Sequence, residues 1–252
     1  MIGICKFCGR EGDLQYSHII PEFFYQYDEK HRFLHVTMAD RYPKFGQKGT
    51  REYLLCRDCE QYFNDKFEKP MKRMWIDRPA LPSVLHGDGI VIRDLEYAPF
   101  KLFHLSVLWR AGVASEAATT VQLGPHEAKI HSMLQDLDPG PATRYPIIAR
   151  VLYLPKTREL ADGVVSMPHA GRNGGQTVYV SVFGGCAWHY VVSSHRVDAT
   201  IQEWALNEAG RMFALVDELR DVQELGAVFR NYQQNAERFG WKDPWAPRKT
   251  DG

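Results

Sequence analysis

Long apolar runs are missing from this 252-residue sequence. A membrane-spanning helix needs about twenty consecutive apolar residues, and no stretch of the chain approaches that length. Charged residues also interrupt every apolar stretch near the N-terminus, which a secretory signal peptide does not tolerate. We therefore expect a cytoplasmic protein that has no membrane partner.

An excess of charge of either sign is also missing, because 31 basic residues balance 31 acidic ones. A protein that coats nucleic acid through bulk electrostatics would carry a clear positive excess. One glycine-containing segment, residues 41–51, nevertheless holds four basic residues and no acidic one. These are Arg41, Lys44, Lys48 and Arg51. Two interpretations are open for them: a solvated loop tip, or contacts to the phosphates of a nucleic acid.

Cysteine is scarce, and four of the five cysteines form two Cys-x-x-Cys pairs. Cys5 and Cys8 make the first pair, and Cys56 and Cys59 make the second. Thiols stay reduced in the cytoplasm, where such pairs bind metal more often than they form disulfides. Four thiolates at this spacing predict a closed, structural Zn²⁺ site, whereas unliganded thiols would leave the pairing unexplained. Cys186 stands alone in an apolar stretch, and we expect it to be a buried small hydrophobe.

The sequence shows no repeats or low-complexity tracts, but three of its 14 prolines mark a shift in composition. Pro70, Pro79 and Pro82 lie close together. Because proline fixes φ and removes a backbone donor, we expect helices to end here and a linker to follow. We place a boundary near residue 80, between an N-terminal zinc module (residues 1–80) and a mixed α+β domain (residues 81–252). The sequence does not name the fold of the second domain.

In the N-terminal part, the pattern predicts two short strands and one helix. The strands are expected at residues 15–20 and 52–55. An aromatic turn or a short helix is expected between them, at residues 21–27. Apolar residues four apart after the second cysteine pair predict a helix over residues 57–69.

In the C-terminal part, strands and helices are mixed. Strands are expected at residues 90–92, 147–154, 164–167, 176–183 and 187–193. Gly184 and Gly185 predict a tight hairpin turn between the last two of these strands. Helices are expected at residues 100–113, 124–137 and, for the most part, 197–239.

Three short stretches of the first 80 residues carry a family resemblance. Residues 5–8 (C-K-F-C), 17–21 (S-H-I-I-P) and 54–60 (L-L-C-R-D-C-E) resemble the zinc-bearing branch of the HNH, or His-Me finger, endonucleases. The usual pattern there is Cys-x-x-Cys, then Asp-His-Ile-x-Pro, then Leu-Cys-x-x-Cys followed by His or Asn. The resemblance implies an α+β chain with an N-terminal ββα-metal, treble-clef-like zinc module. It also implies hydrolysis of phosphodiester bonds with one divalent ion, usually Mg²⁺.

Carried over residue by residue, the resemblance makes His18 the general base that activates water. An ordinary histidine pKa near 6.5 leaves a neutral fraction for this role; the alternative is a histidine that caps the zinc hairpin. Two positions depart from the family pattern, since Ser17 replaces the acidic metal ligand and Glu60 replaces His or Asn. A serine hydroxyl is a poor ligand for a hard cation, so Glu60 would supply the anionic oxygen. Asn64, one turn further, is a candidate second ligand or phosphate contact; the alternatives for Glu60 and Asn64 are a helix N-terminal charge and a solvated amide.

Two functions follow as expectations. The first is a metal-dependent endonuclease that cuts DNA, less readily RNA, in phage defence or a mobile element, a setting that rests on family association alone. The second is a non-catalytic zinc-finger module that binds nucleic acid or a protein partner. Ser17 and the neutral net charge favour the second function, whereas the stretch around His18 and the carboxylate of Glu60 favour the first. Residues 81–252 are the candidate for substrate recognition, for formation of a homo-oligomer or for sensing a signal.

Overall fold

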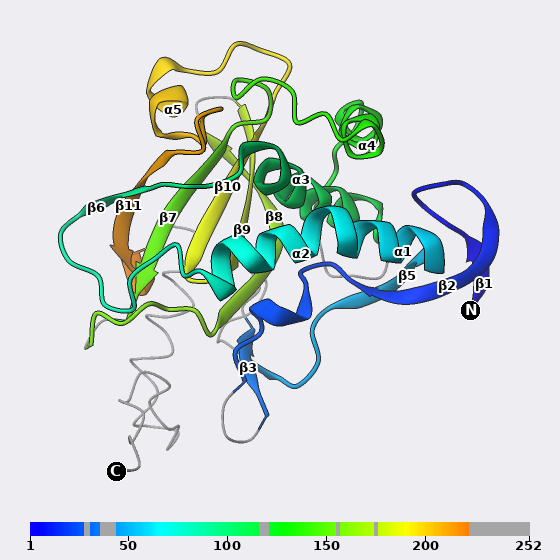
Figure 1. Ribbon diagram of the computed structural model, residues 1–252, viewed down its shortest axis with the longest axis horizontal. Coiled ribbons are helices and arrows are strands. Elements are labelled where there is room, and N and C mark those ends of the chain that lie inside the picture. The colour runs from blue at the N-terminus through cyan, green and yellow to red at the C-terminus, as the bar shows by residue number, and fades with distance from the viewer. Residues whose placement is uncertain (28–30, 36–43, 116–120, 155–156, 174–175, 222–252) are drawn as a thin grey trace.

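The computed structural model combines two sheets with a set of helices (Figure 1). It describes residues 1–27, 31–35, 44–115, 121–154, 157–173 and 176–221. The predicted α+β class is confirmed, with one sheet of three strands and another of eight. The three-stranded sheet lies at one end of the molecule, and strand β6 of the large sheet lies at the other. Among the described helices, none is both long and apolar enough to span a membrane.

The three-stranded sheet has the order β1-β2-β5 and contains both strands predicted for the N-terminal part. It consists of β1 (Ile2–Ile4), β2 (Glu11–His18) and β5 (Arg51–Cys56), all antiparallel. Strand β2 begins earlier than the strand predicted at residues 15–20 and ends two residues sooner. The short 3-10 helix η1 (Glu22–Phe24) follows it, where the sequence predicts an aromatic turn.

The helix after the second cysteine pair is longer than predicted, which corrects the expected end near Pro70. It continues through α1 (Arg57–Phe63), the π-helical turn η2 (Asn64–Glu68), α2 (Lys69–Lys72) and a second π-helical turn, η3 (Arg73–Asp77). The Lys69 N–H bonds the Asn64 carbonyl, five residues back, which is the wide pattern of a π turn. Pro70 then lies in the first turn of a new α-helical segment, where a missing N–H is tolerated.

The eight-stranded sheet has the order β4-β3-β8-β9-β10-β7-β11-β6. Its strands are β3 (Phe33–His35), β4 (Lys44–Gly46), β6 (Gly89–Ile92), β7 (Ile147–Tyr153), β8 (Val164–Asn173), β9 (Gln176–Phe183), β10 (Cys186–Val192) and β11 (Met212–Glu218). All five predicted strands are present, and β9 and β10 form the predicted hairpin around Gly184 and Gly185. Strand β3 was not expected; it joins the sheet beside β8, in parallel. The N-terminal third therefore supplies one edge of the large sheet.

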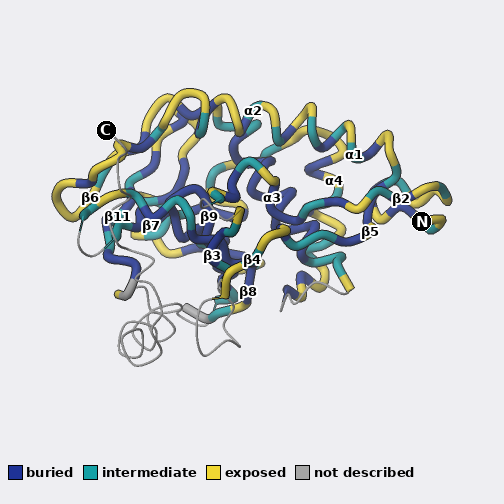
Figure 2. The backbone as a smooth tube through the Cα atoms, turned by 90° about the horizontal axis from the view of Figure 1, so that it is seen from below, coloured by how far each residue is buried: buried dark blue, intermediate teal, exposed yellow. Residues whose placement is uncertain are grey.

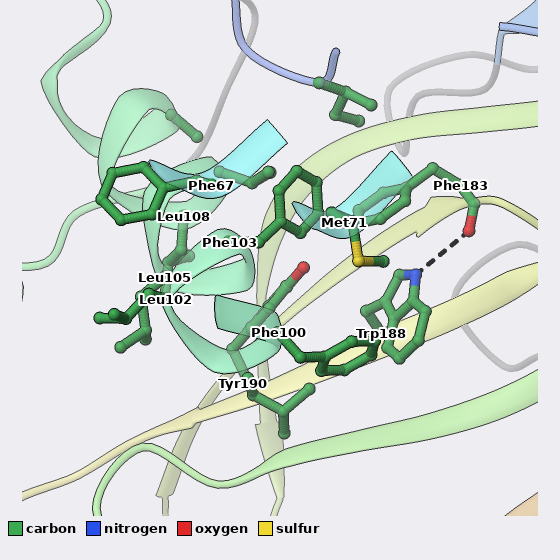
Figure 3. Packing of buried hydrophobic residues seen from close by; sticks show 14 of the residues in the cluster. Phe67, Met71, Phe100, Leu102, Phe103, Leu105, Leu108, Phe183, Trp188 and Tyr190 are labelled. Carbon is green, nitrogen blue, oxygen red and sulfur yellow. Dashed lines mark hydrogen bonds between the residues drawn. The ribbon is translucent and has the colours of Figure 1, made fainter. Parts of the chain in front are cut away.

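One long helix fills the centre of the molecule. Helix α3 (Tyr97–Val113) is buried over most of its length, as the apolar pattern of residues 100–113 predicts. Figure 3 shows its Phe100 and Phe103 grouped around Met71 of α2 together with Phe183 and Trp188 of the large sheet. In Figure 2 the strands at the middle of the sheet are mostly buried, whereas β6 is largely exposed. One apolar cluster extends from Cys5 to Val216, and the boundary near residue 80 between two domains stays a prediction.

The predicted helix over residues 197–239 is wrong for much of its described part. Only α5 (Ala199–Trp204) and the short 3-10 helix η4 (Leu219–Asp221) are helical there, and β11 lies between them. Buried and half-buried residues alternate along β11, which is the two-residue period of a strand. Residues 222–239 lie outside the described part of the chain. The remaining helix, α4 (His126–Asp136), matches its prediction.

Candidate functional site

The two cysteine pairs come together, as their spacing predicts. Cys5 and Cys8 lie in the turn after β1, Cys56 ends β5 and Cys59 lies in α1. The four sulfur atoms all lie within 4.8 Å of one another, and Cys8 Sγ is 3.8 Å from Cys56 Sγ. Zn–S bonds of about 2.3 Å in a tetrahedron place sulfurs roughly 3.8 Å apart. The geometry therefore fits a structural zinc ion that ties β1, β5 and α1 together.

The four thiols of the cluster differ in how readily they ionise. Burial raises the pKa of Cys5 and that of Cys59 above the ordinary thiol value. Burial opposes ionisation of Cys8 as well, but bonding to Arg10 outweighs it and lowers the Cys8 pKa to about 6. Four thiolates packed together repel one another, so their full ionisation needs a metal to balance the charge.

The two strands that carry the candidate residues present different side chains on their two faces. Ser17 pairs across the strands with Glu52, and both are buried. Tyr16 pairs with Tyr53, with ring centroids 4.9 Å apart, and these residues are 55% and 42% exposed. Side chains alternate along a strand, so the β2–β5 pair has a buried side at Ser17 and an exposed side at Tyr16.

His18 ends β2 and is held by its cross-strand neighbour Arg51. The Arg51 Nε–H donates to His18 Nε2 over 2.7 Å. Burial, with the charges of Arg51 and Arg110, lowers the pKa of His18 to about 4. The imidazole is therefore neutral at cellular pH, which is the protonation state of a base, and one of its nitrogens is already engaged.

Ser17 and Glu60, the two positions that the resemblance assigns to a divalent ion, are in direct contact. The Ser17 hydroxyl donates to Glu60 Oε2 over 2.5 Å. Burial raises the pKa of Glu60, although the Ser17 hydrogen bond and the charge of Arg110 oppose this. In the described part of the chain, no hydrogen bond joins the His18 ring to Glu60. The site thus consists of a Ser17–Glu60 pair and a His18–Arg51 pair, built on two consecutive residues of β2.

Arg110 of α3 is the site residue that the sequence reasoning missed. Its guanidinium is fully buried, and Nη1 donates to the His18 carbonyl over 2.7 Å and to Glu68 Oε1 over 2.8 Å. A signal for it was present, because a charged residue inside the apolar stretch of residues 100–113 must find a partner when it is buried. Its charge acts on both halves of the site, since it influences the pKa of His18 and that of Glu60.

The other predicted residues are placed less centrally. Asn64 begins the π turn η2, and none of the described side-chain hydrogen bonds involves it. Lys44 lies in β4 at the edge of the large sheet, and Lys48 is exposed in the segment that leads to β5. Arg41 lies outside the described residues. Of the three basic residues that the structure describes, Arg51 is thus the one beside the candidate base.

A second metal ion has few protein ligands here. Among the described residues, the four cysteines are the only group of three or more His, Cys, Asp or Glu side chains that could hold an ion. Glu60 offers one carboxylate, which suits Mg²⁺ only when substrate phosphates and water complete its shell. No protein-family model, curated protein or solved structure matches this chain.

Proposed function

We propose that the N-terminal module is a metal-dependent endonuclease of the HNH type, with a zinc-held ββα-metal fold, that hydrolyses phosphodiester bonds in DNA and, less readily, in RNA. One observation carries the proposal: a neutral, half-buried His18 ends β2 beside a guanidinium, one residue from the Ser17–Glu60 pair. The order of β2, β5 and α1, with zinc ligands at their junctions, supports it.

In this enzyme His18 takes a proton from a water molecule, and the resulting hydroxide attacks phosphorus. The bond from phosphorus to the 3′ oxygen breaks, and that oxygen takes a proton from solvent. One water and one phosphodiester thus give a 5′-phosphate and a 3′-hydroxyl, and His18 then returns its proton to solvent. Glu60 would hold the divalent ion, which when bound stabilises negative charge on the phosphate. Residues 81–252 would select the substrate, and phage defence or a mobile element would be the setting.

A second candidate function is a non-catalytic zinc module that binds nucleic acid or a protein. The specific observation in its favour is that Ser17 is fully buried and its hydroxyl donates a hydrogen bond to the Glu60 carboxylate. A carboxylate bonded inside the protein is less free to bind a metal ion than one that faces solvent.

A plasmid-nicking assay with Mg²⁺, Mn²⁺ or Ni²⁺ separates the two functions. We expect wild type to nick supercoiled DNA and His18→Ala to lose at least about a hundredfold in rate, since general-base catalysis contributes that much or more. His195→Ala is the matched control, because His195 is exposed and far from the module in sequence. Equal cutting by the His18 variant would remove His18 from the mechanism. Binding of DNA or RNA without cutting, with every metal, would favour the second function.

A further inference from the structure

We propose that Arg51 caps the catalytic base in the free protein and that a substrate phosphate removes the cap. This inference rests on the proposed nuclease function, and it assigns Arg51 two roles. The residue first holds His18 idle and then binds the anion whose arrival makes His18 active.

The cap is built into the strand pairing. His18 and Arg51 lie directly opposite each other in the β2–β5 ladder, so their backbones hold the two side chains together. The bond uses the Nε–H of the guanidinium, and its length is 2.7 Å. Among the described residues, the outer nitrogens reach one carboxylate, Glu22 Oε1, which lies 3.6 Å from Nη2 and belongs to a side chain that is 60% exposed. The Arg51 side chain is itself 28% exposed, so a ligand can reach it from solvent.

The hydrogen bond leaves the imidazole without a free lone pair. An arginine in a protein stays protonated, so the guanidinium is always the donor and His18 Nε2 always the acceptor. A neutral ring that accepts at Nε2 carries its proton on Nδ1. Neither nitrogen can then take a proton from water, and His18 cannot act as a base while Arg51 stays in place.

A phosphate is the ligand best suited to release the base. A guanidinium binds an anionic phosphate through two parallel hydrogen bonds in which both the donor and the acceptor are charged. Its bond to a neutral imidazole is a single one. When a backbone phosphate of the substrate reaches the exposed side of Arg51, the guanidinium can exchange partners, and Nε2 becomes free next to the bound phosphate.

Nitrogen-15 NMR of the His18 ring tests the exchange directly and needs no cleavage. The probe is a short DNA duplex with phosphorothioate linkages, added to the full chain without a divalent ion. We expect free wild type to show the Nδ1–H form with a hydrogen-bonded Nε2, and the Nε2 resonance to move to that of an unbonded nitrogen as DNA binds. Arg51→Met should show the unbonded resonance before DNA is added, whereas Arg93→Met, which changes an exposed arginine outside the module, should behave as wild type.

Two results would overturn the proposal: an Nε2 resonance that DNA leaves unchanged in wild type, or one that is the same in wild type and Arg51→Met. The wild-type titration remains decisive if Arg51→Met fails to fold, which its zinc content would reveal. Failure of the nuclease proposal would appear separately, as absence of nicking by a protein whose Nε2 resonance does respond to DNA.

Discussion

Replacement of Arg110 by methionine tests how the centre of the molecule holds the site in place. Arg110 is buried, with a side chain that is 1% exposed, and it pairs with Glu68 over 2.8 Å. It also satisfies the carbonyl of His18, 92 residues away in the sequence. Methionine keeps much of the apolar stem but removes the charge and every donor.

The expected loss of stability follows from the two groups that Arg110→Met leaves without a partner. Removal of one partner from a buried ion pair costs about 3–5 kcal/mol, because the other charge stays desolvated. Glu68 is 19% exposed, so water can reach it and the cost should lie near the lower end of that range. The unsatisfied His18 carbonyl adds about 1 kcal/mol. We therefore expect Arg110→Met to lower the free energy of unfolding by about 3–4 kcal/mol.

Urea denaturation provides the measurement, and the chain offers a matched control. Arg73 and Glu96 form a pair of similar length, 2.9 Å, but their side chains are 48% and 56% exposed. Arg73→Met should therefore cost at most about 1 kcal/mol. The double variant of Arg110→Met with Glu68→Met should be more stable than the sum of its single changes predicts. Equal costs for Arg110→Met and Arg73→Met would refute the assignment of a buried, stabilising pair.

Three further predictions concern the metal, acid stability and a tight turn. Cys56→Ser should abolish zinc binding measured by elemental analysis of the purified protein, whereas Cys186→Ser should retain it, since Cys186 lies outside the cluster. Burial holds the pKa of His104 well below its ordinary 6.5, so this residue stabilises the fold above that pH. Its contribution to the free energy of unfolding should fall by up to about 1.4 kcal/mol per pH unit below pH 6.5. The urea midpoint of His104→Gln should therefore depend less on pH than that of wild type. Gly184→Ala should lower the thermal midpoint, because residue 184 has φ +59° and a Cβ would lie 2.7 Å from the Phe24 ring; an unchanged midpoint would contradict this turn geometry.

Features with a local cause could be predicted from the sequence. The cysteine cluster depends on two Cys-x-x-Cys turns, each of which places its own sulfurs side by side. The β9–β10 hairpin depends on Gly184 and Gly185, whose positive φ angles suit the turn. Helix α3 depends on an apolar run that can only be buried. Each of these signals lies within a few consecutive residues, where spacing and conformational preference are enough.

Long-range partners were decided only by the tertiary structure. The sequence identified His18 and Glu60 but not which groups would touch them. In the folded protein, Arg51 and Arg110 contact His18, and Ser17 contacts Glu60. Likewise, the segment of β11 became a strand because β6 and β7 flank it on both sides. The free energy of a buried charge or an unpaired strand depends on neighbours that are distant in the chain. A local pattern therefore predicts that such a partner must exist, and packing decides which residue it is.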